Sequence, residues 1–183
     1  MNASTPTSVD QIDWLRWTPT ERATLLFVID GDQILLIRKK RGMGAGKVNG
    51  PGGRMEGDES SEACAVRETI EELHVTPLSP TLRARQRFHF VDGYRLTVFC
   101  FVSYAHEGIA TETDEAAPLW TALDAIPYEE MWADDALWLP RILRGEIVDG
   151  RYIFDGDTMV DYAFREPAVL ADIAMDRPKT NRR

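Results

Sequence analysis

The sequence predicts an α/β domain built around a mixed β-sheet. The chain has 183 residues, of which 44% are hydrophobic, so it is long enough for one sizeable core and short for two. Apolar runs of strand length alternate with two stretches of helical spacing, a pattern typical of layered α/β folds. The sequence has no internal repeat and no break in composition. We therefore expect one domain at residues 23–168, an N-terminal extension at 1–22 and a tail at 169–183.

The expected elements follow in order along the chain. Residues 23–29 and 33–37 are predicted strands joined by a turn signal, and a glycine-rich loop covers residues 42–53. Trp14 and Trp17 indicate that the extension either docks or stays mobile, and Trp120 and Trp138 are assigned to the core. The tail DRPKTNRR is expected to be disordered. Helices are predicted at 60–73 and 131–143, and further strands at 83–91, 95–104, 119–122, 151–154 and 160–164.

Charge and composition exclude several classes of function. A net charge of -9 and a pI of about 4.9 disfavour a nucleic-acid binder, because an acidic protein repels polyanions. No apolar run approaches the roughly 20 residues that span a bilayer, and the first residues lack a secretory leader. Cys64 and Cys100 fit a reducing compartment, so we expect a cytoplasmic protein. Binding of a small anionic ligand is still possible if basic residues or a metal ion are concentrated at one site.

The helix expected from Ser60 carries a cluster of carboxylates. Ser60 is a suitable N-cap, and a stripe of apolar residues is predicted to face the core, with Glu68, Glu71 and Glu72 on the opposite side. Like charges three or four residues apart destabilise a helix by about 0.2–0.5 kcal/mol per pair. The plain interpretation is a solvated acidic face. The predicted core stripe consists of Ala63, Val66, Ile70 and Leu73.

A metal–polyphosphate site is the alternative interpretation of this cluster. Mg²⁺ prefers clustered carboxylates together with substrate phosphates, and the preceding glycine loop lets backbone groups approach the same ion or phosphate. Arg67 can orient and charge-balance the glutamates, and a basic run at residues 38–41 precedes the loop.

From Gly53 to Val75 the segment GRMEGDESSEACAVRETIEELHV resembles the signature box of the Nudix family. It departs from the usual pattern at Thr69 and at His74, where glycine commonly ends the helix in the left-handed conformation. The similarity extends from Thr24 to Glu166 and points to the branch of the family that hydrolyses oxidised purine nucleoside triphosphates. The resemblance implies an α/β/α sandwich with a mixed β-sheet, that is, a Nudix hydrolase domain at residues 23–168.

The resemblance also implies which residues carry the chemistry. Mg²⁺, with Mn²⁺ as an alternative, would be held by Glu68, Glu71 and Glu72, by Glu115 and by the carbonyl of Gly52. These glutamates and Arg67 form the implied catalytic set, in which a metal lowers the pKa of a bound water and a carboxylate accepts its proton. Taken without the resemblance, Glu115 reads as an exposed loop acid.

Substrate contacts are implied on both sides of the glycine loop. Trp132 would stack on a purine, and Asp134 and Asp135 would read its edge, with the pKa of one of them raised by the other. The alternative is that the two aspartates form the exposed start of a helix. Met43 and Pro51 replace aromatic residues of the family pattern, which affects substrate preference. The remaining implied contacts are Lys39, Gly53 and Arg54 for the phosphates and sugar, and Thr24, Asn49 and Phe88 for the base.

The resemblance favours a Mg²⁺-dependent diphosphatase that splits oxidised purine nucleoside triphosphates such as 8-oxo-dGTP into monophosphate and pyrophosphate. Such an enzyme sanitises the nucleotide pool and acts on a small-molecule nucleotide, not on nucleic acid or a membrane. A second hypothesis keeps the chemistry and changes the substrate to ADP-ribose, a dinucleotide or an unmodified triphosphate. A third is a non-catalytic ligand-sensing module, which would be expected to lose the carboxylates that this chain retains.

Overall fold

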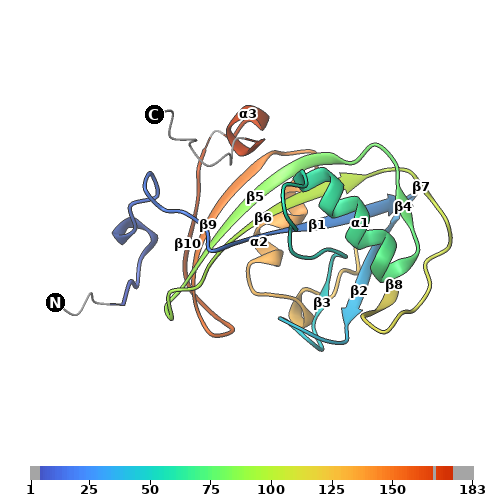
Figure 1. Ribbon diagram of the computed structural model, residues 1–183, viewed down its shortest axis with the longest axis horizontal. Helices are drawn as coiled ribbons and strands as arrows, with labels where there is room; N and C mark the ends of the chain where they lie inside the picture. Colours follow the sequence, from blue (N-terminus) through green and yellow to red (C-terminus); the bar gives the residue numbers. More distant parts are fainter. Residues whose placement is uncertain (1–4, 167, 175–183) are drawn as a thin grey trace.

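The computed structural model describes residues 5–166 and 168–174 and has an eight-stranded mixed β-sheet as its centre (Figure 1). The expected tail DRPKTNRR lies outside the described residues. Each predicted strand is present, with bounds that shift by a few residues. The strands of the sheet are β1 (Glu21–Asp30), β2 (Gln33–Lys39), β3 (Val48–Asn49), β5 (Thr81–Phe90), β6 (Arg95–Ser103), β8 (Ala116–Ala122), β9 (Val148–Asp155) and β10 (Thr158–Phe164).

The strand order along the sheet is β10-β9-β5-β6-β1-β2-β3, and β8 also pairs with β2. β1 with β6 and β5 with β9 are parallel, while the other pairs are antiparallel, so the sheet is mixed as predicted. A separate two-stranded ladder joins β4 (Thr76–Pro77) to β7 (His106–Glu107).

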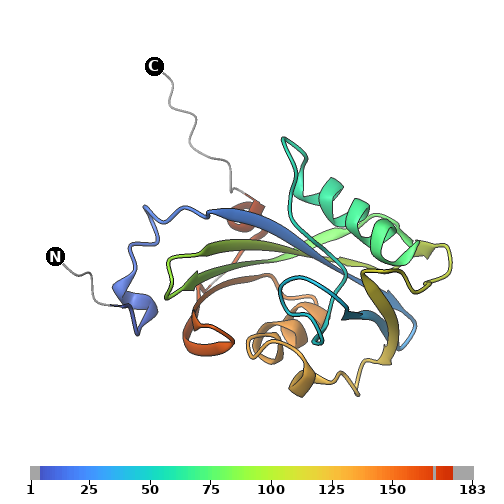
Figure 2. The same cartoon turned by 60° about the horizontal axis from the view of Figure 1, so that its bottom comes forward.

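Helices cover both faces of the sheet. Figure 2 shows α1 (Ser61–Leu73) on one side and α2 (Asp135–Leu143) on the other. Side chains of alternate strand residues fill the two layers: Leu26 and Phe101 pack in the core beneath α1, whereas Phe27 and Cys100 pack in the other core, against Trp138 of α2. The α/β/α sandwich is therefore confirmed. No helix in the described part of the chain is long and apolar enough to cross a membrane.

Helix α1 begins and ends as predicted, but its buried face is different. The Ser60 hydroxyl caps the helix by accepting from the backbone N–H of Ala63 at 3.1 Å. His74 itself adopts the left-handed conformation at the end of the helix, with φ of 58°, and its ring hydrogen-bonds to Thr111 at 2.7 Å, so the terminal turn survives without glycine. The predicted stripe was wrong except for Leu73, since Ala63 and Ile70 are exposed. The buried residues are Cys64, Ala65, Thr69, Glu72 and Leu73.

Three local predictions also need correction. The glycine-rich segment includes the short strand β3, because Val48 and Asn49 pair with β2. The second helix begins at Asp135 and not at 131, after the 3-10 turn η2 (Tyr128–Glu130). A short helix, α3 (Leu170–Ala174), follows the sheet and buries Ile173, where a tail was expected. Trp138 is buried as predicted, whereas Trp120 is half-buried.

The described part of the N-terminal segment docks on the sheet. It contains the 3-10 turn η1 (Val9–Gln11), and the backbone N–H of Val9 donates to the Asp161 carboxylate at 2.8 Å. The Trp14 ring lies 5.6 Å from the guanidinium carbon of Arg87 and 5.3 Å from that of Arg151, which face each other across β5 and β9. Of the two predicted behaviours, docking is therefore the correct one.

Candidate active site

One cavity of about 530 Å³ brings together most of the residues predicted from the sequence. It opens between the glycine loop, the inner side of α1 and the strands that carry Phe88 and Phe154. Arg67 and Glu71 do not line it and lie on α1 beside it. The predicted residues that line the cavity are Thr24, Lys39, Asn49, Gly52, Gly53, Arg54, Glu68, Glu72, Phe88, Glu115, Trp132, Asp134 and Asp135.

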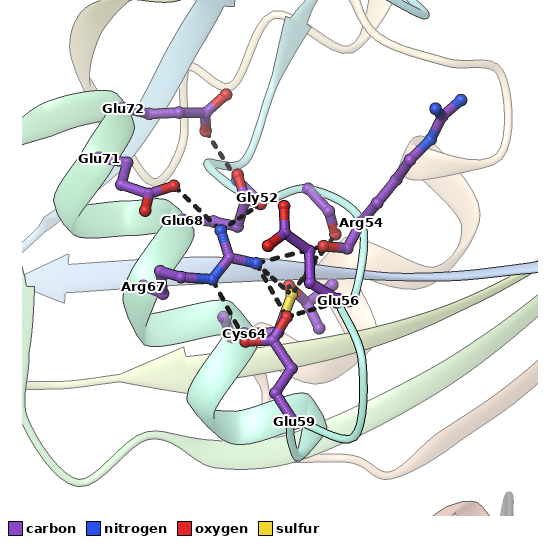
Figure 3. Close-up of polar contacts among 12 residues, drawn as sticks. Gly52, Arg54, Glu56, Glu59, Cys64, Arg67, Glu68, Glu71 and Glu72 are labelled. Atoms are coloured by element: carbon purple, nitrogen blue, oxygen red, sulfur yellow. Dashed lines mark hydrogen bonds and ion pairs between the residues drawn. The ribbon is translucent and has the colours of Figure 1, made fainter.

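At one end of the cavity, Arg67 organises the acidic residues of α1. Its guanidinium donates to Glu59 at 2.8 Å, to Glu68 at 2.9 Å and to Glu71 at 3.0 Å, as Figure 3 shows. This ion pair lowers the pKa of Glu59 to about 2. Burial raises the pKa of Glu68, although Arg67 opposes the shift.

Glu72 points inward from α1 and is only 1% exposed. Its carboxylate accepts from the backbone N–H of Gly52 at 2.8 Å (Figure 3) and lies 3.5 Å from the Lys39 ammonium. Burial raises the pKa of Glu72, and the Gly52 N–H and Lys39 partly oppose that rise. The glycine loop is thus held directly against the carboxylate cluster, as the sequence predicted.

Glycines at positions 52 and 53 allow this approach. A Cβ added to Gly52 would lie 2.0 Å from the backbone oxygen of Thr24, which cannot move aside, and a Cβ added to Gly53 would displace the Glu68 carboxylate from its present position. Glu115, from the loop before β8, reaches the same cavity and pairs with Arg41. Arg54 lines the cavity and pairs with Glu21 at 3.0 Å.

These residues fit a hard divalent cation in their chemistry. The donors are carboxylate oxygens gathered at one end of a cavity next to a lysine, which suits a metal ion that shares its ligands with phosphates. Within the described residues, no three acidic, histidine or cysteine side chains already stand in metal-ligand geometry. The carboxylates are instead paired with basic side chains: Glu68 and Glu71 with Arg67, and Glu72 with Lys39.

At the other end of the cavity, two adjacent aspartates are buried, each 2% exposed. The Asp134 carboxylate accepts from the indole N–H of Trp138 at 2.9 Å, and that of Asp135 accepts from the backbone N–H of Trp132 at 3.0 Å. Burial raises the pKa of Asp134 to about 6, and burial together with the charge of Asp134 raises that of Asp135 well above its usual range. The alternative of an exposed helix start is therefore wrong, although Asp134 does occupy the N-cap position.

Aromatic side chains complete this end. The Lys47 ammonium lies 4.9 Å from the centre of the half-buried Trp132 ring. Phe88 stacks on Tyr152 with ring centres 5.0 Å apart.

The two polar residues predicted to contact the base each have a partner within the protein. The Asn49 side chain accepts from the N–H of Gly50, and the Thr24 hydroxyl lies 3.3 Å from the Cys64 sulfur.

Several cavity residues were missed by the sequence reasoning. Trp138 was assigned only to the core, yet it also holds Asp134. Gln86 and Phe90 lie two residues before and after the predicted contact Phe88 on β5 and line the cavity with it, together with Phe154 from β9. The alternation itself was a signal that these side chains share one face of the sheet.

The sequence matches the family described as NUDIX domain over residues 19–142. The chain belongs to the Nudix family. Members of this family generally use divalent metal ions, in agreement with the carboxylate cluster on α1.

Two curated relatives are similar over most of their length. The oxidized purine nucleoside triphosphate hydrolase of Danio rerio is 38% identical over 145 residues, which is 78% of this chain and 93% of that protein. The protein of the same name from Mus musculus is 37% identical with the same coverage. A solved structure of the MutT protein from Bacillus halodurans is 28% identical and has a TM-score of 0.73, covering 81% of this chain and 99% of the other.

Proposed function

We propose that this Nudix protein is a Mg²⁺-dependent diphosphatase that hydrolyses oxidised purine nucleoside triphosphates, such as 8-oxo-dGTP, to the monophosphate and pyrophosphate. The observation that carries the proposal is the arrangement of one cavity, which has buried Asp134 and Asp135 at one end and Glu68 and Glu72 of α1 with Lys39 at the other. The names of the zebrafish and mouse relatives support the same substrate class.

The base end suits an oxidised purine because its two acids differ in their hydrogen-bonding capacity. With the pKa values of both raised, one acid can stay protonated and donate to a base carbonyl while the other accepts from ring or exocyclic N–H groups. Trp132 supplies a stacking face, worth about 1–3 kcal/mol in comparable base contacts. Met43 also lines the cavity, so it contributes to the choice among oxidised purines.

The charged residues at the other end of the cavity suit a metal-bound triphosphate. Lys39 and Arg54 bind phosphate oxygens, and Glu68, Glu71, Glu72 and Glu115, with the carbonyl of Gly52, hold Mg²⁺. When bound, Mg²⁺ neutralises phosphate charge and makes water a better nucleophile. Arg67 keeps the glutamates oriented through its three ion pairs.

In the cell this activity would remove mutagenic precursors from the nucleotide pool. Cys64 and Cys100 are buried and free, which supports a reducing location such as the cytoplasm. We take residues 23–168 as the catalytic domain, with 1–22 and 169–183 as its extensions.

The test is a substrate panel in which pyrophosphate release is measured with Mg²⁺. The panel contains 8-oxo-dGTP, 2-hydroxy-dATP, dGTP, dATP, ADP-ribose and a dinucleotide, and the variant E72Q is the control for contaminating activity. We expect the highest kcat/KM for an oxidised purine triphosphate, with monophosphate and pyrophosphate as products. Faster cleavage of ADP-ribose or the dinucleotide would overturn the substrate assignment, and tight binding without turnover would identify a sensing module.

A further inference from the structure

Gln86 places an unpartnered hydrogen-bond donor in the wall of the substrate cavity. The residue lies in the middle of β5, is 0% exposed and lines the cavity. Its side-chain oxygen accepts from the hydroxyl of Tyr152 at 3.0 Å. Its side-chain nitrogen is buried and has no partner among the described residues. A buried donor without an acceptor is unfavourable and calls for an explanation.

The surroundings of Gln86 are built to hold its amide in place. Gly150 is its register partner on β9, and a Cβ there would lie under 3.0 Å from both the Gln86 oxygen and the Tyr152 hydroxyl. The absence of a side chain at position 150 therefore makes room for the Gln86–Tyr152 pair. Tyr152 is itself fixed by stacking on Phe88. With the oxygen end held, the amide group directs its N–H donors away from Tyr152.

The neighbouring groups show what kind of ligand atom is needed. Gln86, which is bonded to Tyr152, lines the same cavity as Asp134 and Asp135. Of the two aspartates, the ionised one can only accept from N–H groups of a base. An amide nitrogen can only donate, so it requires an acceptor on the ligand. The exocyclic acceptors of a purine are carbonyl oxygens, whereas an exocyclic amino group offers donors in the same position.

We propose that Gln86 is a specificity-determining residue that donates a hydrogen bond to a carbonyl oxygen of the bound purine. The inference rests on the proposed function, because it assumes that the base occupies the end of the cavity lined by Asp134 and Asp135. Gln86 thereby favours a keto purine such as 8-oxoguanine over an amino purine with no carbonyl oxygen, such as adenine.

The experiment measures binding of 8-oxo-dGMP and dAMP by titration calorimetry to the full chain, so it does not depend on turnover. Q86L is expected to bind 8-oxo-dGMP on the order of 10-fold more weakly, as for loss of one hydrogen bond to a buried group, and to bind dAMP as the parent does. T97V is the matched control: the Thr97 hydroxyl is also buried without a partner among the described residues, but on the face of the sheet toward α1. T97V should bind both nucleotides like the parent.

A double variant separates a direct contact from a disturbance of Tyr152. Q86L leaves the Tyr152 hydroxyl without its acceptor, and Q86L/Y152F removes that hydroxyl while keeping the aromatic ring. If the lost donor is the cause, 8-oxo-dGMP binding stays weak in the double variant. Recovery of binding in Q86L/Y152F, an equal loss for dAMP in Q86L, or a loss of the same size in T97V would each overturn the proposal.

The two proposals can fail separately. If the parent binds 8-oxo-dGMP through Gln86 but does not hydrolyse 8-oxo-dGTP, the proposed function fails and the recognition by Gln86 stands. If the parent hydrolyses 8-oxo-dGTP and Q86L matches it in binding and in kcat/KM, Gln86 has no role in specificity. A parent chain that binds neither monophosphate would also overturn the assignment of Gln86.

Discussion

Asparagine at position 134 or 135 tests base recognition with little disturbance of the fold. One carboxylate oxygen of Asp134 accepts from the Trp138 indole, and one of Asp135 accepts from the backbone of Trp132. An asparagine oxygen can accept the same bonds, so each of these contacts is preserved in its variant. The change falls on the second oxygen, which becomes an NH₂ group that cannot gain or lose a proton.

The magnitude follows from the burial of both side chains, each 2% exposed. A buried polar group left without its partner costs about 1–3 kcal/mol, which corresponds to a factor of about 5 to 150 in binding or rate. We expect the ratio of kcat/KM for 8-oxo-dGTP over dGTP to fall by a factor in this range in D134N or D135N. Slow hydrolysis of dGTP should change less, because guanine lacks the N7–H donor and the C8 carbonyl of 8-oxoguanine.

The assay is steady-state pyrophosphate release with each nucleotide in turn, in the presence of Mg²⁺. W132A is the comparison variant, because the loss of a stacking face should weaken every purine substrate without changing the ratio. Thermal melting checks that each variant is folded. An unchanged ratio in both aspartate variants would refute the reasoning and leave Asp134 and Asp135 with a structural role at the start of α2.

Other expected outcomes concern the metal end, the N-terminal segment and pH. E71Q and E72Q should nearly abolish turnover. The melting temperature of each should stay close to that of the parent, since the amide oxygen at position 72 still accepts from the Gly52 N–H. Parental rates in both variants would contradict the metal-site proposal. A chain that begins at Glu21 should keep its kcat and KM for 8-oxo-dGTP, because none of the described residues before it lines the cavity; a folded but inactive truncation would show otherwise. Burial raises the pKa of Asp134 from 3.8 to about 6, so its neutral form is favoured in the folded state. The free energy of unfolding of the parent, followed by denaturant titration against D134N, should therefore decrease relative to the variant as pH rises from about 4 to about 6, and an increase would disprove the shift.

Helix α1 illustrates how far periodicity could lead. Its start, its end and the grouping of its glutamates were predictable from capping residues and from 100° per residue. The side that faces the sheet was not predictable, because Ala63, Val66 and Ile70 form the more apolar stripe and yet face outward. The helix instead turns Glu72 inward, where Lys39 and the Gly52 N–H receive it. Hydrophobicity alone places such a carboxylate in solvent. The residue for which this prediction failed, Glu72, is therefore one that belongs to the candidate site.

The base end of the cavity was predictable only in part. Trp132 and the two aspartates stood out through the family resemblance, and their burial agrees with a role in a pocket. Gln86 was predictable only through Phe88, because it lies two residues before that implied base contact and so shares its face of the strand. The pairing of Gln86 with Tyr152 was not predictable, because it depends on the space left by Gly150, a residue 64 positions later that pairs with Gln86 across parallel strands.

The N-terminal segment and one proline lie on two edge strands of the sheet, where they hinder association between molecules. An open sheet ends in strands whose free backbone groups can pair with another molecule and start aggregation. One such strand, β10, is interrupted by an irregularity between Met159 and Asp161, and the docked segment contacts it through Val9. Another, β8, which pairs only with β2 in the described chain, contains Pro118, which has no N–H to offer. Loss of the segment should therefore reduce solubility before it affects catalysis.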